Sequence, residues 1–207
     1  MTELDPRTTA VVAVHCQGDI VGPTGAFADF FHQQVTVRHV IDQIAALIAA
    51  ARTAAATVVY TRVAWKPDFS DLEVNSPLLG IVAQSGCLKE GSELAEIVEP
   101  LAPHGDDIVL THQRIGAFAR TDLDTVLREK GITTLVFAGV ATNASVEGTA
   151  RVASDLGYRV VIVEDACSAA TPAAHHASID SLGLLAEIST VDEVRTALTA
   201  TVTGTRA

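Results

Sequence analysis

Residues 139–147, with the sequence GVATNASVE, combine residue types that can carry catalysis. An apolar run over residues 132–137 ends at Gly139, and apolar residues recur at helical spacing from Val146 onward. The segment is therefore predicted to join the carboxyl end of a strand to the amino end of a helix, where free N–H groups and a partial positive charge suit an oxyanion. Ser145 falls in the first turn of that helix, a position typical of a nucleophile. The same residue types also suit simple helix capping, with Ser145 merely tolerated.

The elements that must position this segment follow from alternating patterns along the chain. Apolar runs predict strands at residues 9–15, 57–63, 108–111, 133–138, 159–163 and 187–190. Helical spacing predicts helices at residues 35–55, 121–130, 145–156 and 171–185, and the DEVRTAL segment predicts a terminal helix. Such alternation indicates a parallel sheet covered on both faces, with right-handed crossovers. We therefore predict an α/β fold, a three-layer α/β/α, Rossmann-like arrangement around an open parallel sheet of about six strands.

Composition limits the classes of protein that fit. With 207 residues and 48% hydrophobic content, the chain suits one domain over residues 1–207. A net charge of −11 without a basic cluster argues against nucleic-acid and anionic-membrane partners. No apolar run approaches the roughly 20 residues of a membrane span, and the start MTELDPR lacks the regions of a signal peptide. A cytoplasmic protein with a small-molecule substrate is the expectation.

The sequence from Gly139 to Leu182, GVATNASVEGTARVASDLGYRVVIVEDACSAATPAAHHASIDSL, resembles the isochorismatase-like hydrolases of the cysteine hydrolase superfamily. The segments TTAVVAVHCQGDI, GSELAEIVEPLAPHGDDIVLTHQRIGAFARTDLDTVL and DEVRTAL agree with that family in the same order, so the resemblance covers nearly the whole chain. It implies a cofactor-free hydrolase of a small molecule, a homo-oligomer such as a dimer or tetramer, and a cis peptide near Val140-Ala141.

The resemblance also implies an atypical catalytic triad. Most members of the family carry an Asp at the end of the first strand, a Lys before an Ala-Phe segment and a nucleophilic Cys at the helix start. Here those places are filled by His15, His112 and Ser145. A small shift in the middle segment would let Arg114 supply the cation instead of His112.

The replacements are chemically coherent with one another. A serine hydroxyl is a poor nucleophile unless a base removes its proton, and histidine, with an ordinary pKa of about 6.5, is the commonest such base. We expect His15 to be the base for Ser145, and His112 or Arg114 to polarise or orient the substrate. Backbone N–H groups of the turn at Val140 and Ala141 would hold the oxyanion.

Further substrate-binding residues are expected around this triad. The long loops at residues 20–31 and 64–89 are predicted pocket walls, with Trp65 and Phe118 as aromatic lining. Gln17 is expected to bind near the substrate and to orient the first loop. Residues 61–68 lack the histidine of the metal motif that nicotinamidases carry, so we predict no metal. His175 and His176 stand together in a helix without an obvious functional partner.

Two other functions fit the same residues. A cationic His15 could act as an acid, in the manner of isochorismatase-type members that cleave a vinyl ether without a cysteine nucleophile. Loss of all three usual residues is also what a decayed site looks like, which would leave a binding protein with an intact fold. The sequence leaves these alternatives open.

Overall fold

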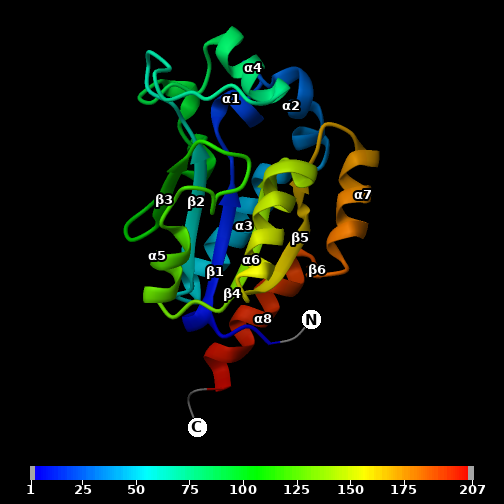
Figure 1. The fold of residues 1–207 in the computed structure, drawn as a ribbon. Helices are drawn as coiled ribbons and strands as arrows, with labels where there is room; N and C mark the ends of the chain where they lie inside the picture. Colours follow the sequence, from blue (N-terminus) through cyan, green and yellow to red (C-terminus); the bar gives the residue numbers. More distant parts are fainter. Residues whose placement is uncertain (1–2, 205–207) are drawn as a thin grey trace.

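The computed structural model describes residues 3–204 and contains a six-stranded, entirely parallel sheet in the order β3-β2-β1-β4-β5-β6 (Figure 1). The strands are β1 (Thr9–Val14), β2 (Thr57–Val63), β3 (Ile108–His112), β4 (Thr134–Val140), β5 (Arg159–Ser168) and β6 (Glu187–Ser189). The helices are α1 (Gly18–Val21), α2 (Ala28–Val37), α3 (Val40–Thr53), α4 (Pro77–Ser85), α5 (Leu123–Glu129), α6 (Glu147–Asp155), α7 (Pro172–Leu182) and α8 (Val191–Gly204). The predicted α/β fold is thus confirmed. The predicted domain of residues 1–207 also includes residues 1–2 and 205–207, which lie outside the described part of the chain.

Helices cover both faces of the sheet, which explains the continuous apolar strands. Val11 and Ala13 of β1 join a core with α3 and α8, whereas Ala10, Val12 and Val14 join a second core with α5, α6 and α7. Successive side chains of a strand point to opposite faces, so a central strand buried on both sides has no polar face.

The predicted bounds differ most from the structure at two places. The helix expected over residues 35–55 is divided into α2 and α3, because His39 between them adopts a left-handed backbone conformation with φ of 53°. Val37 lies at the end of α2 and is 67% exposed. The strand predicted at residues 159–163 continues to Ser168, and its pairing with β4 shifts register between Phe137 and Gly139.

The two long loops hold the short helices α1 and α4, which lie with α2 above the carboxyl ends of the strands (Figure 1). This is the edge where open parallel sheets bind their ligands. Among residues 3–204, no helix is long and apolar enough to cross a membrane.

Candidate active site

Two histidines meet at the carboxyl ends of two strands that flank β2. His15 directly follows β1 and His112 is the last residue of β3, on the two sides of β2. The N–H of His15 donates to the carbonyl of Thr61 in β2 at 2.9 Å, and His15 adopts a φ of 52°. The Nε2 atoms of the two rings are 2.9 Å apart, and the rings are tilted by 32°. Strand order therefore brings together two side chains that lie 97 residues apart in the sequence.

Burial keeps both imidazole rings neutral. It lowers the pKa of His15 well below its ordinary value, and the adjacent His112 ring adds to that effect. Burial also lowers the pKa of His112 to about 4, while the backbone of Arg114 acts in the opposite direction. A hydrogen bond between two neutral rings requires one Nε2 to donate and the other to accept. This hydrogen bond uses Nε2 of His15. The other ring nitrogen of His15, Nδ1, therefore remains available to a neighbouring group.

The turn carrying Ser145 begins where β4 ends beside β1. Gly139 has a φ of 128°, and a Cβ there would lie 2.2 Å from the carbonyl oxygen of Val14, so only glycine allows this approach. The Val140-Ala141 peptide is cis, as the resemblance implies. Ser145 then lies within a π-helical turn, η4 (Thr142–Val146), and not in the first turn of a regular α-helix. Such turns are frequent at functional sites.

Side chains from α6 and α7 hold η4 in place. The hydroxyl of Thr149 donates to the carbonyl of Ser145 at 2.6 Å. His175 of α7 places Nδ1 2.8 Å from Thr142 Oγ1 and Nε2 3.0 Å from an Arg38 nitrogen. Arginine can only donate, so His175 Nε2 accepts and its Nδ1–H donates to Thr142. Burial and the Arg38 charge lower the pKa of His175 to about 4.

His175 thus has a structural partner that sequence reasoning missed. Its contacts to Thr142 and Arg38 span 33 and 137 residues of sequence, and no local pattern reports such distances.

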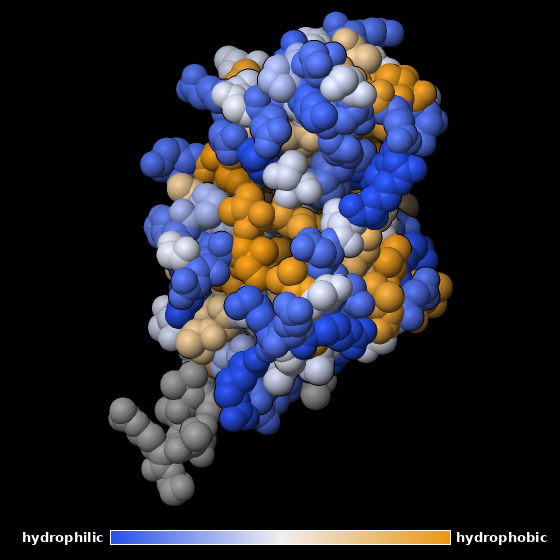
Figure 2. Space-filling model, turned by 60° about the vertical axis from the view of Figure 1, so that its left-hand side comes forward, coloured by the Kyte–Doolittle hydropathy of each residue, from blue (hydrophilic) through white to orange (hydrophobic). Residues whose placement is uncertain are grey.

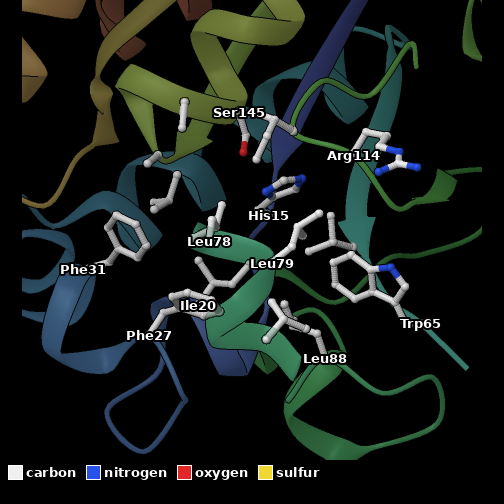
Figure 3. A pocket seen from close by; sticks show the side chains of 16 residues that line it. His15, Ile20, Phe27, Phe31, Trp65, Leu78, Leu79, Leu88, Arg114 and Ser145 are labelled. Carbon is white, nitrogen blue, oxygen red and sulfur yellow. The ribbon is translucent and has the colours of Figure 1, made fainter. Parts of the chain in front are cut away.

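A narrow cavity of about 60 Å³ lies against these groups (Figure 3). His15 and the hydroxyl of Ser145 both point into it. Of the residues predicted for the site, Trp65, Arg114, Val140 and Ala141 also line it, and the loops at residues 20–31 and 64–89 form walls as predicted. The remaining lining residues are mostly aliphatic or aromatic: Ile20, Phe27, Phe31, Val63, Leu78, Leu79, Val82, Leu88, Ile115 and Ala144.

Two predicted substrate contacts lie elsewhere. The Gln17 amide donates to the carbonyls of Val63 and Ala95 at 2.8 and 2.6 Å and accepts the N–H of Val63 at 2.8 Å, so its hydrogen bonds tie the segment after β1 to the end of β2 and to Ala95. Phe118 stacks on Tyr158, with ring centroids 6.2 Å apart, and packs against the core beneath α5 and α6. Neither side chain lines this cavity, so their role as substrate contacts stays a prediction.

The predicted orienting groups also differ from expectation. His112 does not line the cavity, and its ring contacts the ring of His15. Arg114 lines the cavity, but its guanidinium forms an ion pair with Glu73 and is turned away from His15 and Ser145 (Figure 3). Glu73 also pairs with Arg120 at 2.8 Å.

One group of possible metal ligands occurs in the described residues, away from this cavity. Donor atoms of Glu164, His175 and His176 lie within 4.8 Å of one another. However, His175 Nε2 already accepts from the cationic Arg38, which would repel a metal ion. The absence of a metal from the active site stays a prediction.

Comparisons with known proteins agree over nearly the full length. Residues 9–193 match the isochorismatase domain family. The chain is 34% identical over 202 residues to the uncharacterized isochorismatase family protein YecD of Escherichia coli O157:H7, covering 96% of this chain and 100% of that protein.

Solved structures give the same result. A cysteine hydrolase from Pseudomonas syringae pv. phaseolicola 1448A superposes with a TM-score of 0.87 at 28% identity, covering 97% of this chain and 96% of that one. An isochorismatase family protein from Desulfovibrio vulgaris subsp. vulgaris str. Hildenborough superposes with a TM-score of 0.82 at 30% identity, covering 95% of this chain and 99% of that one.

Proposed function

Because the chain belongs to the isochorismatase family, we propose that it is a small-molecule hydrolase that cleaves an amide, ureido or ester bond with Ser145 as nucleophile and His15 as base. One observation carries this proposal. Ser145 and His15 point into the same apolar cavity, while His112 occupies the far nitrogen of the His15 ring. A hydroxyl and a neutral imidazole that open onto one cavity supply the nucleophile and the base that serine activation needs.

The reaction requires one tautomer of the histidine pair. For His15 Nδ1 to accept a proton, the ring must carry its own proton on Nε2 and donate it to His112 Nε2. His112 then acts as a positioning residue that orients the base through this hydrogen bond. In a catalytic triad the third residue orients the base, and His112 has the same role here, although it carries no fixed charge.

The proposed steps use the chain's own groups. The Ser145 hydroxyl transfers its proton to His15 Nδ1 as its oxygen bonds to the carbonyl carbon, and the carbonyl oxygen becomes an oxyanion. The backbone N–H groups near Ala141 and Ser145 are suited to stabilise that charge. His15 then protonates the departing amine or alcohol, and a water molecule activated by the same ring hydrolyses the acyl-enzyme.

The burial of the pair argues against the acid-catalysed alternative. Cleavage of a vinyl ether would need a protonated His15 near neutral pH, but burial and the neighbouring His112 ring lower its pKa well below the ordinary value. A neutral imidazole can accept a proton but has no acidic one to give. The observed pair therefore supports a base more than an acid.

Covalent labelling tests the proposal without knowledge of the substrate. A small alkyl fluorophosphonate should add to wild-type protein, with peptide mapping locating the adduct on Ser145, and Ser145→Ala should remain unlabelled. Ser168→Ala, which removes a buried hydroxyl of β5 outside the cavity, is the matched control and should label normally. The same proteins should then be assayed on short-chain amides, ureido acids and esters. Wild-type protein that neither labels nor turns over any of them would favour a binding protein with a decayed site.

We also propose a cytoplasmic, cofactor-free homo-oligomer, either dimer or tetramer. Support comes from β3, which is an edge strand with Val109 44% exposed. Figure 2, which brings that side of the molecule forward, shows hydrophobic surface between hydrophilic regions. An exposed strand edge with apolar side chains is a surface that a second chain can cover. Light scattering on the purified protein measures the number of subunits.

A further inference from the structure

Arg114 is the lining residue of this cavity that carries a fixed charge, and that charge is already paired. Its guanidinium contacts one carboxylate oxygen of Glu73, and Arg120 contacts the other at 2.8 Å. The Arg114 side chain is 18% exposed and that of Glu73 is 58% exposed, so the pair lies where the cavity wall meets solvent. Figure 3 shows the guanidinium directed away from the space between His15 and Ser145. A ligand in the cavity therefore finds no unpaired cation among the lining residues.

The other residues that line the cavity also disfavour the binding of an anion. Ten of the residues that line the cavity are the aliphatic and aromatic residues named above. Their side chains cannot replace the water molecules that hydrate a carboxylate. Behind the wall, the Asp19 carboxylate accepts the N–H groups of Leu88 at 2.8 Å and Ala26 at 3.4 Å, which places a further acidic group near the site. The net charge of −11 gives the whole molecule a field that opposes the approach of anions.

We propose that Glu73 is a specificity-determining residue: by holding Arg114 in an ion pair, it makes the cavity select small uncharged substrates over carboxylates. The inference rests on the proposed function in taking this cavity as the substrate site. It narrows the substrate class to neutral short-chain amides or esters whose acyl group is apolar.

An isosteric pair of amides tests the preference directly. 4-Methylpentanamide and succinamate have the same shape, but the second ends in a carboxylate where the first ends in two methyl groups. Binding of each to Ser145→Ala protein is measured by calorimetry, so turnover does not interfere. We expect at least a tenfold preference for the neutral amide, which corresponds to about 1.4 kcal/mol.

Removing the carboxylate of Glu73 should change that preference. Glu73→Gln, made in the Ser145→Ala protein, frees Arg114 to reach an anion and should reduce the preference at least fivefold by tightening succinamate binding. Glu96→Gln is the matched control: it removes the same charge from the pair with Arg62 at 2.6 Å, and neither residue lines the cavity. The control should keep the preference of the parent protein.

Three results would overturn the inference: succinamate binding the parent protein as tightly as its neutral isostere, the two glutamate variants changing the preference equally, or neither amide binding any variant. Fluorophosphonate labelling tests the proposed function independently of these binding measurements. Because binding is measured without the Ser145 hydroxyl, a charge preference that holds while fluorophosphonate labelling fails would retain the substrate class and reject the serine mechanism.

Discussion

Acidification should destabilise the fold through the buried histidine pair. In the unfolded chain His112 takes up a proton near its ordinary pKa of 6.5, whereas in the folded protein burial lowers that pKa to about 4. Between these values the unfolded state binds more protons, so stability is full above pH 6.5 and falls as the pH drops toward 4. Lowering the pH from 7.5 to 5.0 should therefore remove about 2 kcal/mol of unfolding free energy through His112 alone.

The size of this effect is isolated by comparison with a variant. His112→Phe keeps an aromatic ring beside His15 but cannot titrate, so its loss between the two pH values should be smaller by about 2 kcal/mol. His104→Gln, which replaces an exposed histidine, is the control and should lose as much as the wild type. Urea unfolding at pH 7.5 and 5.0 supplies the free energies, and fluorescence of the single tryptophan, the buried Trp65, reports the transition. Equal losses in wild type and His112→Phe would refute the reasoning that burial holds this ring neutral.

Two further predictions concern packing around the site. Gly139→Ala should lose at least about 3 kcal/mol of unfolding free energy or fail to fold, because its Cβ would lie 2.2 Å from a carbonyl oxygen at a φ of 128°. Gly80→Ala, in α4 with nothing within 4 Å of the added Cβ, should instead gain about 0.5 to 1 kcal/mol of unfolding free energy. Urea unfolding of both variants checks the contrast. Gln17→Leu should lose roughly 3 kcal/mol of unfolding free energy because it leaves three buried backbone groups without partners. The rate at which a fluorophosphonate labels this variant should nevertheless match that of the wild type. A slower labelling rate in the folded variant would indicate that Gln17 contacts the substrate.

The sheet was predictable because its strands leave a plain signal. β2 has the predicted bounds of Thr57–Val63, and the other strands begin within one residue of their predicted starts. Central strands buried on both faces must be apolar throughout, so their runs stand out from helices and loops. The division between α2 and α3 left no such signal, because apolar spacing continues through His39 while the backbone turns there. A conformational break at one residue does not alter a pattern of side-chain types.

The site was predictable only where chain order decides proximity. His15 and Ser145 both follow strand ends at one edge of a parallel sheet, so topology alone brings them near each other. The side-chain directions of Gln17 and Phe118 depend on loop packing, which sequence position does not determine. The partner of Arg114 could not be predicted either, because Glu73 lies 41 residues away in a long loop.

The electrostatics of the site form one consistent system. The usual family site, as the resemblance implies, is built from fixed charges, whereas this one pairs two histidines kept neutral by burial and ties its one lining cation to Glu73. A neutral, apolar site cannot stabilise a charged ground state, but it strengthens the attraction between charges that arise together within it. Proton transfer from Ser145 to His15 would create such a pair, an imidazolium beside an oxyanion. A bound carboxylate would compete with the oxyanion for that imidazolium and leave a charge buried without a partner. The neutral base that we propose follows from the burial of the histidine pair, and the exclusion of anionic substrates that we propose follows from the pairing of Arg114 with Glu73 beside apolar walls.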